Sequence, residues 1–227
     1  MSPRVIISPS IMCVNPWDYP AHVEAFKQAG VDMIHFDVMD GHFVPNVMLG
    51  TRDYAALKSI TDIPLDLHLM CEEPERIMAY FPISAGDWVS FHPETSRCPY
   101  RTLSHIQSLG CKAGIALSPG TSVEIIREFK SVIDFILVMA VEPGFAGQKM
   151  VPDHLDKLRA IRKIIEEHKL DVEILVDGNT SAANSRAMLE AGATGFVAGT
   201  SSMLKNGPES FITNYNLYLK EIVDPAQ

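Results

Sequence analysis

The segment MIHFDVMDGHFVPN, residues 33–46, holds the pattern that decides the fold. A short apolar run alternates with two polar residues, His35 and Asp37, and turn-forming residues follow directly. Successive side chains of a β-strand point to opposite faces, so His35 and Asp37 share one face and the apolar residues share the other. Buried charges and imidazoles are costly unless they are paired or bound to a metal. The segment therefore predicts a strand that ends in a polar site.

The rest of the chain alternates strand-like and helix-like patterns, giving eight of each. The predicted strands are Val5–Ser10, Met33–Val38, Leu65–Leu69, Trp88–Phe91, Lys112–Leu117, Phe135–Met139, Val172–Val176 and Gly195–Ala198. The predicted helices are Pro16–Ala29, Thr51–Ser59, Pro74–Phe81, Tyr100–Leu109, Ser122–Lys130, Pro152–His168, Ala182–Glu190 and Glu209–Ile222. Eight βα units in this length favour a closed (β/α)8 TIM barrel over an open doubly wound sheet. No linker divides the chain, so we expect one barrel domain over residues 1–227.

Two further strands end like the first. His68 ends the run IPLDLHLM, and Asp177 ends the run VEILVDGN. If the apolar faces pack on the helices, His35, Asp37, His68 and Asp177 converge inside the barrel near its C-terminal mouth, where barrel active sites lie. Two imidazoles and two carboxylates suit a divalent ion such as zinc, manganese, iron or cobalt. The alternative is that each is an interior polar residue with its own hydrogen-bond partner. Asp66, deeper on the His68 face, either orients a ligand histidine or is a satisfied interior carboxylate.

Small residues follow the last three predicted strands. The loops read GFAG at 144–147, DGN at 177–179 and GTS at 199–201. Glycine lets backbone N–H groups approach an anion closely, and barrels often bind phosphate with these late loops. Tight turns are the alternative explanation, but Gly-containing loops on neighbouring late strands favour phosphate. Lys149, the nearest candidate cation, is expected to be solvated.

Composition limits the classes of partner. A net charge of −9 argues against a broad nucleic-acid surface. The longest apolar run, Phe135 to Val141, is too short to cross a bilayer, and no N-terminal signal is recognised. The four cysteines form no C-x-x-C pair, so we expect reduced thiols in a cytoplasmic protein.

Six segments, in this order, resemble the ribulose-phosphate 3-epimerase family. They are ISPSIMC (7–13), HFDVMDGHFVPN (35–46), LDLHLM (65–70), VMAVEPGFAGQKM (138–150), VDGN (176–179) and AGTS (198–201). The resemblance implies a (β/α)8 barrel isomerase that epimerises a phosphorylated ketose at C3 with one divalent metal ion. It implies His35, Asp37, His68 and Asp177 as metal ligands, with Asp37 and Asp177 also as the two acid/base carboxylates that remove and return the C3 proton.

The same resemblance implies a substrate-binding set. It contains Ser8 on the first strand, His68, Asp177, and the methionines Met39, Met70 and Met139 around the reaction site. The loops contribute Gly144, Phe145, Ala146, Gly147, Gly178, Asn179, Gly199, Thr200 and Ser201. The expected partner is a small ketose phosphate, and the family's assemblies imply a homo-oligomer, a dimer or a hexamer.

The loops depart from the usual ribulose 5-phosphate pattern of GFGG, DGG and GS. Together with His92-Pro93-Glu94, they resemble more closely the D-allulose-6-phosphate 3-epimerase branch. We therefore expect D-allulose 6-phosphate as substrate, giving D-fructose 6-phosphate, with Asn179 and Thr200 reshaping the phosphate site. The alternative is D-ribulose 5-phosphate, giving D-xylulose 5-phosphate. His92 and Glu94 either border the substrate or hold the loop, and His42 is expected to be structural.

Two other functions fit the pattern less well. A Schiff-base aldolase needs a lysine at an inward strand position, and no strong candidate is present. A non-catalytic phosphosugar-binding barrel would keep the loops but has no need for both Asp37 and Asp177.

Overall fold

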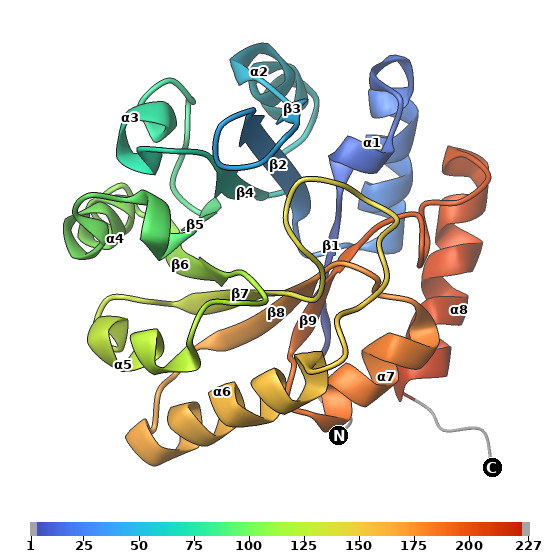
Figure 1. Ribbon diagram of the computed structural model, residues 1–227. Coiled ribbons are helices and arrows are strands. Elements are labelled where there is room, and N and C mark those ends of the chain that lie inside the picture. Colours follow the sequence, from blue (N-terminus) through green and yellow to red (C-terminus); the bar gives the residue numbers. More distant parts are fainter. Residues whose placement is uncertain (1–3, 224–227) are drawn as a thin grey trace.

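The computed structural model describes residues 4–223 and contains one curled sheet of nine strands (Figure 1). The strands are β1 (Ile6–Pro9), β2 (Ile34–Asp40), β3 (Val47–Met48), β4 (Leu65–Met70), β5 (Trp88–Phe91), β6 (Lys112–Leu117), β7 (Phe135–Met139), β8 (Glu173–Asp177) and β9 (Gly195–Ala198). Their order is β1-β9-β8-β7-β6-β5-β4-β2-β3. All neighbours pair in parallel except β3, which pairs antiparallel with β2. A parallel bridge between Ser10 and His35 joins β1 to β2 and closes the ring.

Helices surround this ring, as Figure 1 shows in a view into the barrel. They are α1 (Tyr19–Ala29), α2 (Thr51–Ile60), α3 (Pro74–Met78), α4 (Pro99–Ser108), α5 (Ile126–Phe129), α6 (His154–His168), α7 (Ala182–Glu190) and α8 (Phe211–Val223). Short 3-10 helices cover Ile11–Cys13, Pro16–Asp18, Pro93–Thr95, Val123–Ile125 and Pro208–Ser210. The predicted (β/α)8 barrel is confirmed.

The structure shortens the predicted helices Pro74–Phe81 and Ser122–Lys130 most clearly, and one strand was missed. The α3 helix ends at Met78 rather than Phe81, and the N–H groups of Tyr80 and Phe81 bond three residues back, to the carbonyls of Ile77 and Met78. Phe81 precedes Pro82, a position that disfavours helical backbone. The segment predicted as helix Ser122–Lys130 splits into a 3-10 turn and the four-residue α5. The β3 strand has only two residues, too few for an alternating pattern.

The sheet separates two apolar layers, as strand alternation predicts. Ile34, Phe36 and Val38 are buried in the larger core between sheet and helices. Inside the barrel, Phe135 and Leu175 belong to a smaller apolar cluster. The Phe135 ring leaves no space beside Gly114, where a Cβ would lie 2.4 Å from the Phe135 ring. The barrel interior is thus packed, and the polar residues lie nearer the strand ends.

Side chains also fix the N-terminal ends of four strands. At each place a residue just before one strand accepts a hydrogen bond of 2.8–2.9 Å from a backbone N–H near the start of a neighbouring strand. The pairs are Asp32 with Ile7, Asp87 with Leu65, Asp134 with Ala113, and Thr194 with Ile174. The strand register is therefore secured at the end of the barrel opposite the candidate site.

All four cysteines, Cys13, Cys71, Cys98 and Cys111, are free thiols. Among residues 4–223, no helix has the length and apolar character needed to cross a membrane.

Candidate active site

Four polar side chains converge at the C-terminal end of the barrel. His35 and Asp37 come from β2, His68 from β4, and Asp177 from the last position of β8. One ligand atom from each lies within 4.8 Å of those of the others. The first three are buried, and the Asp177 side chain is 18% exposed. The structure thus brings together the four residues that strand alternation placed on inward faces.

The two histidines face this cluster with different ring nitrogens. His35 Nε2 lies 3.0 Å from Asp37 Oδ1, and its Nδ1 contacts Asp66 Oδ2 at 2.6 Å. His68 instead places Nδ1 3.2 Å from the same Asp37 oxygen, and its Nε2 lies 3.0 Å from His92 Nε2. Asp66 therefore orients His35 rather than the neighbouring His68.

The protein groups displace the pKa values of the two carboxyls in opposite directions. Burial opposes ionisation of Asp37, but His35 and His68 outweigh it and hold the pKa of Asp37 well below its usual range. Burial, followed by the charge of Asp37, raises the pKa of Asp177 to about 6. Burial would lower the pKa of His35, but Asp37 and Asp66 raise it well above its ordinary value. A pair of carboxyls separated in this way can act as base and acid at one pH.

The donor set fits a divalent cation. Two imidazole nitrogens and two carboxylate oxygens are the ligands that zinc, manganese, iron and cobalt share. Asp37 and Asp177 lie close together in a largely buried setting, so a positive charge between them would relieve their repulsion. The buried Asp66 carboxylate behind His35 is the type of partner that orients ligand histidines at metal sites.

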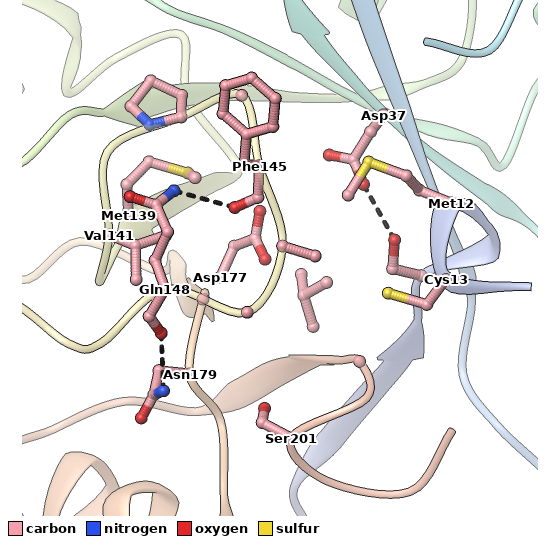
Figure 2. Close-up of a pocket in the computed structure, with 18 of the residues that line it drawn as sticks. Met12, Cys13, Asp37, Met139, Val141, Phe145, Gln148, Asp177, Asn179 and Ser201 are labelled. Atoms are coloured by element: carbon pink, nitrogen blue, oxygen red, sulfur yellow. Dashed lines mark hydrogen bonds between the residues drawn. The ribbon is translucent and has the colours of Figure 1, made fainter. Parts of the chain in front are cut away.

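A cavity opens beside this cluster, and Asp37 and Asp177 reach it from two sides (Figure 2). The predicted methionines Met39, Met70 and Met139 line it. The predicted loop residues also line it, namely Gly144, Phe145, Ala146, Gly147, Gly178, Asn179, Gly199, Thr200 and Ser201. Among the described residues that line the cavity, none is lysine or arginine. Lys149, the nearest candidate cation in the sequence, is exposed and does not line the cavity.

Ser8 does not line the cavity. It is buried, and its hydroxyl lies 3.3 Å from Asp66 Oδ2, so it supports the carboxylate behind His35. Ser10 lines the cavity instead and donates to Asp37 Oδ2 at 2.9 Å. Sequence reasoning missed Ser10, although it has the same strand parity as Ser8. The predicted contact between Ser8 and substrate stays a prediction.

Asn179 connects two of the predicted substrate loops. Its Nδ2 donates to the Gln148 carbonyl at 2.7 Å, and Gln148 Nε2 in turn donates to the Phe145 carbonyl (Figure 2). Gln148 Nε2 also donates to the Glu142 carbonyl. Asn184 Nδ2 donates to the Asn179 carbonyl at 3.0 Å and also to its side-chain oxygen. The amide of Asn179 therefore holds the loop after β7 in place. Asn179 also lines the cavity.

Three further residues that the sequence singled out, His92, Glu94 and His42, have partners within the protein. His92 is buried against His68 and does not line the cavity. Glu94 accepts hydrogen bonds from Ser118 and Thr121. His42 is exposed and bonds back to Asp40 through its backbone N–H and Nδ1, as expected for a turn residue.

These features define a class: a (β/α)8 barrel with a His/Asp metal-type centre and glycine-rich loops at the mouth. A profile of the ribulose-phosphate 3-epimerase family matches residues 6–203. The ribulose-phosphate 3-epimerase of Synechocystis is 41% identical over 202 residues, which cover 88% of each chain. The enzymes of that name from Bacillus subtilis and Escherichia coli are each 38% identical, over 86% and 87% of this chain and 90% and 88% of theirs. The chain belongs to the ribulose-phosphate 3-epimerase family and is a sugar-phosphate isomerase.

Solved structures with low sequence identity support the fold alone. KGPDC from Streptococcus mutans aligns with a TM-score of 0.67 at 14% identity, covering 96% of this chain and 98% of that one. Thiamine phosphate pyrophosphorylase from Pyrococcus furiosus aligns with a TM-score of 0.62, also at 14% identity, covering 96% of each chain. The sequence relatives do not support the expected preference for allulose 6-phosphate; they favour the ribulose phosphate alternative.

Proposed function

We propose that the protein is a metal-dependent epimerase that interconverts D-ribulose 5-phosphate and D-xylulose 5-phosphate. The observation that carries this proposal is the placement of two carboxylates, Asp37 and Asp177, beside two imidazoles at one cavity. The names of the relatives support the five-carbon sugar.

The reaction inverts C3, so a proton must leave one face of the carbon and another must arrive at the opposite face. Asp37 and Asp177 carry out these two steps, and their roles exchange when the reaction runs in reverse. Ser10 donates to Asp37 Oδ2 and fixes the orientation of that carboxylate. His35, Asp37, His68 and Asp177 would hold a divalent cation of the zinc, manganese, iron or cobalt group. When bound, that cation polarises the C2 carbonyl and so acidifies the C3 proton.

The walls of the cavity protect the carbon acid from water. Met39 and Met70 pack with Val44 in an apolar cluster at the mouth, and Met139 lines the cavity from β7. Unbranched thioether side chains adapt to a planar or a tetrahedral carbon without adding a competing acid. The glycine-containing loops receive the phosphate through backbone N–H groups, because the described lining offers no cationic side chain.

Single-carboxylate variants test the two-base mechanism. Asp37→Asn and Asp177→Asn are each expected to lower kcat for epimerisation by about 10²–10⁴-fold, the usual contribution of a general base. Each variant retains one base, so each should exchange the C3 hydrogen of only one epimer with solvent deuterium, without inversion. NMR of both epimers in D2O measures this exchange. The exposed Asp62→Asn serves as control. Wild-type product without solvent deuterium at C3 contradicts the mechanism.

The length of the sugar is tested on one metal-loaded sample. We expect kcat/KM for D-ribulose 5-phosphate to exceed that for D-allulose 6-phosphate. A clear preference for the six-carbon substrate would overturn the choice of sugar while leaving the epimerase reaction intact.

A further inference from the structure

A line of hydrogen bonds leads from His68 away from the cavity to the protein surface. His68 Nε2 lies 3.0 Å from His92 Nε2, and His92 Nδ1 lies 3.0 Å from Ser118 Oγ. Ser118 Oγ lies 3.3 Å from Glu94 Oε1, which also accepts from Thr121 Oγ1 at 2.9 Å. The Glu94 side chain is 37% exposed, whereas His68 and His92 are fully buried.

The chemistry of the end group gives the line a direction. Ser118 donates its single O–H to the Glu94 carboxyl oxygen, which leaves its oxygen lone pair for His92 Nδ1–H. With its proton on Nδ1, neutral His92 offers a lone pair at Nε2, and His68 must then donate from Nε2. The other ring nitrogen, His68 Nδ1, is left with a lone pair facing Asp37 and Asp177.

We propose that Glu94, Ser118 and His92 are positioning residues that hold His68 in the tautomer needed to bind the cation through Nδ1. This inference rests on the metal site of the proposed function. His68 would thus be oriented by a hydrogen-bonded line that ends at the surface residue Glu94, whereas His35 is oriented by the buried carboxylate of Asp66. The opposite direction of the line would put a proton on His68 Nδ1 and exclude it as a ligand.

Contacts with neighbouring groups hold the residues of this hydrogen-bonded line in position. The Nζ of Lys157, from α6, donates to the Pro119 carbonyl at 3.1 Å and the Thr121 carbonyl at 2.7 Å, and it also bonds the Ser118 carbonyl. The loop that carries Ser118 is thereby fixed to a long helix. The His92 ring packs against Phe43, with centroids 4.7 Å apart. Ser118 and His92 are therefore both held by contacts outside the line.

Cation affinity is the first test, because it needs no turnover. In zinc competition with a chromophoric chelator, Ser118→Ala and Glu94→Leu are expected to weaken binding by about 10–100-fold, as lost orienting contacts do at other metal sites. Glu94→Gln keeps an acceptor oxygen and should stay within about threefold of wild type. Ser108→Ala is the matched control, since Ser108 Oγ bonds within its own helix region. Equal affinity in Ser118→Ala and wild type overturns the proposal.

The tautomer of His92 is the second test. In the zinc-loaded wild-type protein, long-range nitrogen-proton NMR should show His92 protonated at Nδ1 and unprotonated at Nε2. A proton on Nε2 would overturn the proposal whatever the affinities. Ser118→Ala should give a mixture of the two forms with unchanged secondary structure. If these patterns hold and no epimerase activity is found, the failure lies with the proposed reaction and not with the support of His68.

Discussion

Gly178 follows Asp177 directly and begins a loop proposed to bind substrate; its φ is +102°, a conformation open chiefly to glycine. A Cβ at this position would lie 2.6 Å from Val141 Cγ2 and 3.1 Å from Cγ1. Both the backbone conformation and the neighbouring loop therefore exclude a side chain. By contrast, nothing lies within 4 Å of a Cβ built on Gly120.

Gly178→Ala is expected to raise KM for the sugar phosphate at least about tenfold, the effect of about 1.4 kcal/mol. The added methyl displaces either its own loop or Val141. Val141→Ala in the same chain should recover part of the loss by removing the close contact, and Gly120→Ala should behave like wild type. Steady-state kinetics on the four proteins give the answer. An unchanged KM in Gly178→Ala would show that this backbone does not shape the substrate site.

Strand alternation was sufficient to find the residues of the cluster, because period two decides which face each side chain occupies. It placed His35 and His68 on inward faces, but it could not say which ring nitrogen meets the carboxylates. That choice depends on Asp66 and His92, which lie behind the rings. Nor could the loop motif reveal that the amide of Asn179 bonds to the Gln148 carbonyl.

At the scale of elements, Asp87 illustrates how strand starts are held. It is 1% exposed, accepts from Leu65 N–H at 2.9 Å, Ser84 N–H at 3.0 Å and Tyr54 O–H at 2.9 Å, and pairs with Lys58 Nζ at 2.7 Å. Burial opposes ionisation of Asp87, but Lys58 and the backbone donors outweigh it and lower its pKa. One carboxylate thus joins α2 to the starts of β4 and β5.

Asp87→Asn should lower the free energy of unfolding by about 3 kcal/mol, because charge-assisted bonds are lost and a donor replaces an acceptor. Because the pKa of Asp87 is lower in the folded than in the unfolded protein, its ionisation stabilises the fold at pH values above its ordinary pKa of about 4. This stabilisation is lost as the pH falls through the lower pKa of the folded protein. The difference between wild type and variant should therefore be full at pH 7 and shrink below about pH 4. Urea unfolding at several pH values measures it, with Asp62→Asn as control. A pH-independent difference would contradict the ionic explanation.

Most elements could be predicted, because eight alternating βα units leave few topologies. The errors arose at a helix end and at a very short strand, where the sequence pattern carries little information. The α3 helix was drawn as far as Phe81, the residue before Pro82, and the two-residue β3 was too short to show an alternating pattern. Neither error moved a residue of the cluster, since the strands that carry it are long and strongly patterned.

At the scale of the whole molecule, closure of the ring creates the site. Asp37 and Asp177 are far apart in sequence, and β1 and β9 lie between their strands in the sheet order once the Ser10–His35 bridge closes the ring. Binding of a cation should therefore stabilise the entire barrel, because the proposed ligands come from strands at the start and near the end of the fold.

A cation at about 1,000 times its Kd should stabilise the folded protein by about 4 kcal/mol, which corresponds to a rise in Tm of about 10 °C for a chain of this size. Calorimetry with and without a chelator measures the rise. His68→Asn should reduce it strongly, whereas the exposed His105→Asn should leave it unchanged. Equal shifts in the two variants would place the stabilising ion elsewhere.

The absence of lysine and arginine from the described lining of the cavity also bears on how substrate arrives. The chain carries a net charge of −9, and the ligand is a phosphate dianion, so the long-range field repels each incoming molecule. At 0.1 M salt the Debye length is about 10 Å, so the repulsion is largely screened beyond that distance. Diffusional encounter should consequently become faster as ionic strength increases, the reverse of an enzyme that draws anions toward a basic entrance.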